Sequence, residues 1–97
     1  MEMSKIEPNR YTALGDFLKA RRNKIKPEQI GISVGTRRRT PGLRREEVAQ
    51  LAGIGLTWYT WLEQGREINV SESVLESLTR VFLLTSEERS KVEFNEI

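Results

Sequence analysis

The sequence predicts an all-α domain of five helices, and three observations lead to this fold class. Apolar residues recur three and four positions apart, as on one face of an α-helix. Residues that cap or end helices separate these stretches. The 97 residues include 26 Leu, Ile, Val or Phe, enough apolar side chains for a folded core. We therefore expect residues 1–97 to form one small domain.

The first helix is expected to start at Thr12, as its N-cap, and to be stopped by Pro27. Its apolar face would carry Leu14, Phe17, Leu18 and Ile25. The cations Arg21, Arg22 and Lys24 would lie near its C-terminus, where the helix dipole favours positive charge.

Residues 27–42, PEQIGISVGTRRRTPG, are expected to form a basic loop after this helix. Five of these sixteen residues are Pro or Gly, which is typical of a loop. Aliphatic residues stand at every second position, at Ile30, Ile32 and Val34, so a short extended segment is also possible here. We favour an ordered loop in which these three aliphatic residues pack on the body and display the run Arg37–Arg39.

Two short helices are predicted next, from about Arg44 to Ala52 and from about Leu56 to Gln64. Gly53 suits a turn with positive φ, Gly65 ends the second helix, and the small Ala49 allows the helices to cross closely. Apolar inner positions are Val48, Ala52, Ile54, Tyr59 and Leu62. Together these features predict a helix-turn-helix over about 45–64.

Ser71 is expected to cap a fourth helix, and a capping box of Thr85 and Glu88 is expected to start a short fifth one. The inner face of the fourth helix would carry Val74, Leu75, Leu78, Val81 and Phe82. A dimer interface is expected near Phe82, Leu83, Leu84 and Phe94, although Phe82 also fits a core position.

The formal net charge of +2 hides a strong segregation of charge along the chain. Residues 19–45 hold ten Lys or Arg and one acid, whereas residues 46–97 hold four cations and ten acids. A net charge of +9 in 27 residues indicates a polyanionic partner, with a solvated basic face as the alternative.

Several function classes are excluded by what the sequence lacks. It has no Cys and no His, so we expect no disulfide, zinc site or imidazole catalysis. It has no glycine-rich nucleotide motif, and helix capping explains its adjacent Glu pairs, so an enzyme or a bound cofactor is not expected. No apolar run approaches a membrane span, and residues 1–9 do not resemble a signal peptide. A cytoplasmic location with no membrane partner is the expectation.

The run LRREEVAQLAGIGLTWYTWLEQGR at 43–66 resembles the helix-turn-helix of XRE/Cro-type transcriptional regulators, and LGDFLKARR at 14–22 resembles their opening helix. The segments RRRTPGLRREEVA and WYTWLEQGR resemble the MmyB-like subgroup of bacterial regulators. The resemblance covers residues 14 to about 89. It implies a lambda-repressor-like fold with a basic loop inserted between its first two helices. Since a ligand-binding domain usually follows in this subgroup, we expect the DNA-binding part alone or a truncated relative, with an effector ligand only if such a domain lies beyond residue 97.

The resemblance implies sequence-specific binding of double-stranded DNA by a transcriptional regulator, with the recognition helix at about 56–64 in the major groove. The base contacts that it implies are Arg45, Leu56, Thr57, Trp58, Thr60 and Trp61. Arg45 suits either a phosphate or a guanine. Relatives often have polar residues at 56 and 61, so Leu56 and Trp61 favour contact with thymine methyl groups. The alternative to a base contact is that one of the two tryptophans, Trp58 or Trp61, packs in the core or at a dimer interface.

Phosphate contacts are expected at Arg44 and Arg66, and at a basic arm formed by Arg37, Arg38 and Arg39. The alternative for the arm is a solvated loop, or pairing with acids of the C-terminal half. The resemblance also implies an internal ion pair between Arg22 and Glu63, whose alternative is an unpaired surface acid.

A homodimer is expected, because one such motif buries little surface and dimers on two half-sites are usual for this architecture. The alternative function is a protein–protein interaction module, or an antitoxin-type regulator whose main partner is another protein. RNA is less expected, because the motif suits the major groove of B-form DNA.

Overall fold

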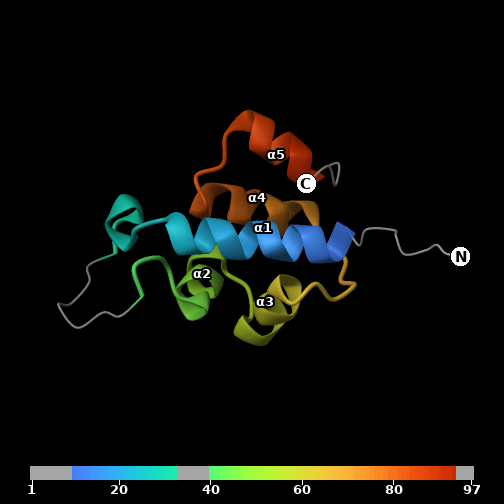
Figure 1. Cartoon of the computed structure of the whole chain (residues 1–97), viewed down its shortest axis with the longest axis horizontal. Helices are drawn as coiled ribbons and strands as arrows, with labels where there is room; N and C mark the ends of the chain where they lie inside the picture. Colours follow the sequence, from blue (N-terminus) through green and yellow to red (C-terminus); the bar gives the residue numbers. More distant parts are fainter. Residues whose placement is uncertain (1–9, 33–39, 94–97) are drawn as a thin grey trace, which may run out of the picture.

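The structure, a computed structural model, describes residues 10–32 and 40–93. These residues form five α-helices and one short 3-10 helix, which confirms the predicted all-α fold (Figure 1). The elements are α1 (Arg10–Lys24), η2 (Pro27–Ile30), α2 (Arg45–Ala52), α3 (Leu56–Glu63), α4 (Glu72–Val81) and α5 (Ser86–Glu93). The described residues contain no strand.

The start of α1 differs from the prediction. The helix begins at Arg10, so Thr12 lies inside it and is not the N-cap. Tyr11 is partly buried and lines, with Leu14, Leu75 and other residues, a pocket of about 230 Å³ between α1 and the segment before α4. The helix therefore continues on the N-terminal side of the predicted cap and includes Tyr11.

The end of α1 is explained by Pro27, which lies three residues beyond it. The helix stops at Lys24, and Lys26 is extended with φ −78° and ψ 138°, the conformation that a following Pro favours. Pro27–Ile30 then forms the 3-10 helix η2, and Gly31 follows with φ 84°. Of the extended piece considered at Ile30, Ile32 and Val34, Ile30 belongs to this 3-10 helix, and the part from residue 33 on lies outside the described residues.

The basic loop is attached to the body by two of its three predicted aliphatic residues. Ile30 and Ile32 are partly buried and pack against the core. Val34 and the run Arg37–Arg39 lie outside the described residues, so their predicted roles stay predictions.

Helix α1 runs through the middle of the molecule in Figure 1, with α4 and α5 above it and α2 and α3 below it. Helix α3 packs on α1, and α2 packs on both α3 and α4. The crossing of α1 and α3 depends on Gly15, where an added Cβ would lie 2.5 Å from the backbone oxygen of Glu63. A glycine is thus required where α1 passes α3.

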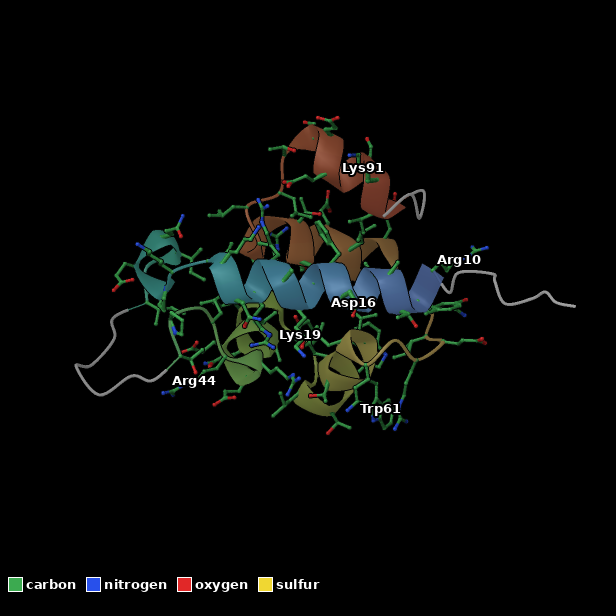
Figure 2. The ribbon with its side chains drawn as sticks, in the orientation of Figure 1. Arg10, Asp16, Lys19, Arg44, Trp61 and Lys91 are labelled. Carbon is green, nitrogen blue, oxygen red and sulfur yellow. The ribbon has the colours of Figure 1, made fainter. Side chains whose placement is uncertain are left out.

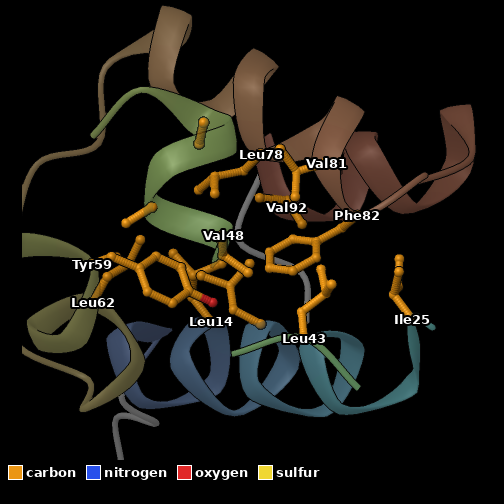
Figure 3. Packing of buried hydrophobic residues seen from close by; sticks show 13 residues of the cluster. Leu14, Ile25, Leu43, Val48, Tyr59, Leu62, Leu78, Val81, Phe82 and Val92 are labelled. Atoms are coloured by element: carbon orange, nitrogen blue, oxygen red, sulfur yellow. The ribbon is translucent and has the colours of Figure 1, made fainter. Parts of the chain in front are cut away.

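The core draws on every α-helix, as Figure 3 shows for Leu14, Val48, Tyr59, Leu78 and Val92. Phe82 has no exposed surface, so it belongs to the core and not to an interface. Leu84 is partly buried against the core, whereas Leu83 is 46% exposed.

The predicted caps of the last two helices are present. The Ser71 hydroxyl accepts a hydrogen bond from the backbone N–H of Val74. Thr85 and Glu88 form the capping box, each side chain accepting a bond from the backbone N–H of the other residue. Both caps depend only on neighbours in the chain.

An arginine clamp that the sequence did not predict fastens α5 to α1. Arg21 donates to both carboxylate oxygens of Glu88, at 2.9 and 3.1 Å, and to the backbone oxygens of Phe82 and Leu83. The turn between α4 and α5 is thereby held against the C-terminal half of α1.

Candidate nucleic-acid interface

The turn between α2 and α3 follows from two glycines. Gly53 ends α2 in the left-handed conformation, with φ 72°, which glycine adopts without steric cost. The backbone N–H of Ile54 returns to the carbonyl of Ala49 at 2.9 Å, and the side chain of Ile54 packs against the core. Gly55 then precedes α3 with ordinary extended angles, φ −71° and ψ 142°.

Helix α3 has one face in the core and one face open. Tyr59, Leu62 and Glu63 are buried. On the other face, Leu56 is 46% exposed and Trp61 is 39% exposed. Thr57 is exposed as well, while Thr60 is partly exposed and its hydroxyl donates to the carbonyl of Leu56. Four of the predicted base-contact residues of α3 therefore share its open face.

Trp58 and Trp61 lie in different environments. Trp58 is partly buried and packs against the core, so it offers less free surface to a ligand than the other predicted contacts of α3. Trp61 faces outward, and the Arg66 guanidinium lies over its ring at 4.8 Å from the ring centre. This cation–π contact keeps Arg66 beside the open face of α3.

A buried ionic cluster anchors α3 from the inside. The predicted pair of Arg22 and Glu63 is present, with Arg22 Nε 2.6 Å and Nη2 3.0 Å from the two carboxylate oxygens. Arg22 Nη1 also donates to the carbonyl of Leu43. Two further donors reach the same carboxylate: the Tyr59 hydroxyl at 2.6 Å and Arg45 Nε at 3.0 Å.

These contacts decide the charge states in the cluster. Burial by itself would raise the pKa of Glu63, but hydrogen bonds from Arg22, Tyr59 and Arg45 outweigh it, and the pKa is lowered. Burial and the neighbouring carboxylate raise the pKa of the Tyr59 hydroxyl, so it stays a donor. The hydrogen bond to Glu63 raises the pKa of Arg22 despite its burial. The cluster is an ion pair whose carboxylate accepts four hydrogen bonds, the kind of compensation that lets a buried charge be tolerated.

Sequence reasoning missed two of the four members as structural partners. Tyr59 and Glu63 are four residues apart on α3, a spacing that brings side chains together on one helix face, so this contact had a local signal. The bond from Arg45 had none, because it joins residues 18 positions apart on different helices.

A polar hollow lies where the start of α2 meets the start of α3. Its volume is about 350 Å³, and its walls include Arg45, Glu46, Leu56 and Thr60. The Arg45 side chain is 41% exposed there, and Arg44 is exposed at the position before it. In Figure 2, Arg44 and Trp61 lie on the same side of α1, opposite Lys91 of α5.

Metal and membrane sites have no support in the part of the chain that the structure describes. Residues 10–32 and 40–93 contain no group of three or more acidic, Cys or His side chains placed to hold a metal ion. Within the same ranges, the helices are too short and too polar to cross a bilayer.

Comparison with known families agrees with this geometry. A family model described as a helix-turn-helix domain matches residues 13–92, which include all of α2, the glycine turn and α3. No curated protein and no solved structure matched the chain. Because the family match covers most of the chain and includes the helices that frame the open face, the chain belongs to the helix-turn-helix domain family, a type of domain that binds DNA and is typically not an enzyme.

Proposed function

We propose that this chain is the DNA-binding domain of an XRE-type bacterial transcriptional regulator of the MmyB-like subgroup, and that it reads a specific duplex sequence. The observation that carries the proposal is the open face of α3, bordered by Arg44 and Arg45 at one end and by Arg66 at the other. A helix with one apolar face in the core and one free face between cations suits insertion into the major groove.

The open face divides into two kinds of contact. Leu56, Thr57, Thr60 and Trp61 would meet base edges, with Arg45 beside them and with Trp58 at the rim. The exposed Arg44 and Arg66 would meet phosphates on the two sides of the groove. Phosphate contacts from Arg37, Arg38 and Arg39 remain part of the proposal.

Two copies are expected to bind together on a site with two half-sites. Leu83 supports a contact between copies, because it is a large apolar residue, 46% exposed, at the end of α4 and away from α3. Sedimentation at rising concentration, with Leu83→Ser as the variant, tests this arrangement.

The function is tested by selecting bound sites from random duplexes and then titrating the enriched duplex at several salt concentrations. We expect one sequence to be enriched, with affinity that falls steeply as salt rises. Arg44→Ala should weaken binding to all duplexes alike and reduce the log–log salt slope by about 0.9, as the loss of one phosphate contact does. If no sequence is enriched and the affinity does not change with salt concentration, the result would contradict sequence-specific DNA binding and favour a protein partner.

A further inference from the structure

Arg45 is held at one end and free at the other. Its Nε donates to Glu63 at 3.0 Å, and that carboxylate is only 1% exposed and is itself held by Arg22 and Tyr59. Within the described part of the chain, the contacts of the Arg45 guanidinium are made by Nε alone, and no hydrogen bond or ion pair engages Nη1 or Nη2. Because Nε is fixed, the two Nη groups remain available as donors on a side chain that is 41% exposed.

The free end has the geometry that guanine requires. A guanidinium is planar, so holding Nε leaves the two Nη groups as a fixed pair of donors at the outer edge. Guanine presents two acceptors, O6 and N7, side by side in the major groove, and an arginine fork bonds both. Because Glu63 already orients Arg45, little side-chain freedom is lost on binding.

The surroundings of Arg45 favour a base over a phosphate. Charge alone suits either partner, because Glu63 also pairs with Arg22 and the two guanidiniums with one carboxylate leave a net charge of +1. Leu56 lines the same hollow as Arg45 and is 46% exposed, so the hollow offers apolar surface as well as donors. Thr60 lines it too, but its hydroxyl proton is already used on the Leu56 carbonyl. Apolar surface beside a donor fork matches a thymine methyl group beside a guanine.

We propose that Arg45, positioned by Glu63, reads a guanine and that Leu56 contacts the methyl group of a neighbouring thymine. Glu63 is then a positioning residue: it touches no base, and its effect on specificity passes through Arg45. The inference rests on the proposed function, because it specifies which bases are contacted by the open face of α3 and the adjacent Arg45.

The test uses the selected duplex with single-atom changes in its bases. Replacing the guanine by 7-deazaguanine removes N7, and replacing the thymine by deoxyuridine removes the methyl group. For the unaltered protein, we expect the N7 change to weaken binding by about 5- to 150-fold, the range of one good bidentate base contact. Arg45→Ala should abolish sensitivity to 7-deazaguanine, and Leu56→Ala should abolish sensitivity to deoxyuridine.

Arg45→Lys and Arg44→Ala are the matched controls. Arg45→Lys keeps the charge but loses the fork, so it should retain the salt slope and lose most of the guanine preference. Arg44→Ala should keep the full sensitivity to both base changes. The inference is overturned if Arg45→Ala keeps its sensitivity to 7-deazaguanine, or if it weakens all duplexes alike with a salt slope lower by about one, as a phosphate contact would.

The role of Glu63 is measured by a ratio. In Glu63→Gln, the ratio of the affinities for the guanine and 7-deazaguanine duplexes should fall toward one, because Arg45 is no longer oriented. This ratio does not depend on the fraction of protein that is folded, so a loss of stability alone would leave it unchanged. If this variant does not fold, nitrogen-15 relaxation of Arg45 Nε in the unaltered protein replaces it. An ordered Nε before DNA is added supports positioning, and a freely rotating one overturns it.

The two hypotheses fail in different ways. An unenriched selection with no salt-dependent binding removes the proposed function and this inference with it. An enriched duplex without a guanine that depends on Arg45 removes the inference alone.

Discussion

At the scale of single residues, the carboxylate of Glu63 joins three helices of this domain. It accepts bonds from Arg22 of α1, Arg45 of α2 and Tyr59 of its own helix α3. Only 1% of its side chain is exposed, so water cannot replace a lost partner. The position of α3 therefore depends on the charge of one buried side chain.

Glu63→Gln is expected to lower the free energy of unfolding by about 3 kcal/mol, because it leaves the buried Arg22 without its counter-charge. Urea denaturation followed by circular dichroism measures this change. Glu67→Gln is the control, because Glu67 is an exposed acid nearby, where an effect within about 0.5 kcal/mol is normal. Equal losses in both variants would contradict a structural role for the cluster.

The same cluster makes stability depend on pH in one direction. The pKa of Glu63 is lower in the folded protein than in the unfolded chain, so its contribution is complete above the unfolded value of about 4.3 and is lost as pH falls through the folded value. The free energy of unfolding should therefore fall on acidification below about pH 4.

Glu63→Gln should flatten this acid dependence without removing it. Glu88 still contributes, because its pKa is also lowered, by the backbone N–H of Thr85 and by Arg21. Unfolding curves taken at several pH values for both proteins check the difference. An unchanged slope in Glu63→Gln would show that Glu63 keeps an ordinary pKa in the folded protein.

The sequence predicted part of this cluster. The pair of Arg22 and Glu63 was expected from resemblance to a family, not from spacing, since the two residues are 41 positions apart. Arg45 was placed at the interface, but its bond to Glu63 was not foreseen. That bond depends on how α2 crosses α3, which local sequence patterns do not specify.

At the scale of elements, a single glycine controls how α1 meets α3. Gly15 is buried in the middle of α1, and its missing side chain lets the backbone of α3 approach. A Cβ there would lie 2.8 Å from the carbonyl oxygen of Leu62, closer than real contacts of this kind. Backbone atoms cannot rotate away as a side chain can, so the helices would have to separate.

Gly15→Ala tests this close approach, because the sign of its effect on the free energy of unfolding separates two expectations. Helix propensity alone would make the substitution stabilising by about 1 kcal/mol. The clash with the α3 backbone reverses this, and we expect a loss of about 1–3 kcal/mol, the usual cost of overpacking. Thermal unfolding measures it, with Gly55→Ala as the control because a Cβ there meets nothing within 4 Å. A more stable Gly15→Ala protein would contradict the account.

Helix boundaries were predictable where they depend on neighbours in sequence. Ser71, Thr85 and Gly53 act through residues within four positions, and each capping assignment holds. The start of α1 was not predictable in this way. The helix includes Tyr11, which lines a pocket together with Ile68 and Val70 from the segment before α4, and no local pattern marks this neighbourhood.

At the scale of the whole molecule, the acidic helix α5 and the open face of α3 lie apart, although Glu88 of α5 pairs with Arg21 of the basic segment 19–45. Helices α4 and α5 lie above α1 in Figure 1 and α3 lies below it, although α4 also packs on α2. Helices α4 and α5 carry the exposed acids Glu72, Glu76 and Glu87, and Arg44 and Arg66 flank α2 and α3. The proposed DNA-facing side therefore has few of the acids that would repel phosphates.

Two matched charge reversals test this separation. Glu46 and Glu87 are both exposed acids in the first turn of an eight-residue helix, and replacing either by Lys changes the net charge by the same amount. Glu46→Lys should strengthen binding to a random duplex and steepen the log–log salt slope by up to about 0.9. Glu87→Lys should have a much smaller effect, because α5 and α3 lie at opposite edges of the molecule in Figure 1. Equal effects would show that net charge matters more than its position.

The placement of α5 could not be predicted from the sequence. The Arg21 clamp joins residues 61 to 67 positions apart, and no local pattern marks Arg21 as different from its basic neighbours. The charge count correctly separated the two halves of the chain, but only the folded arrangement shows on which side of α1 the acids lie.

The division of α3 into a buried and an open face has a consequence for how such proteins diverge. Tyr59, Leu62 and Glu63 hold the helix in the fold, while Leu56, Thr57 and Trp61 contribute mainly to its surface. Exchanges on this surface should alter unfolding free energy by only about 0.5 kcal/mol, a small part of the stability of a domain. If the open face reads DNA as proposed, one copy of a duplicated gene can acquire a new DNA target through a few substitutions while both copies keep the same scaffold.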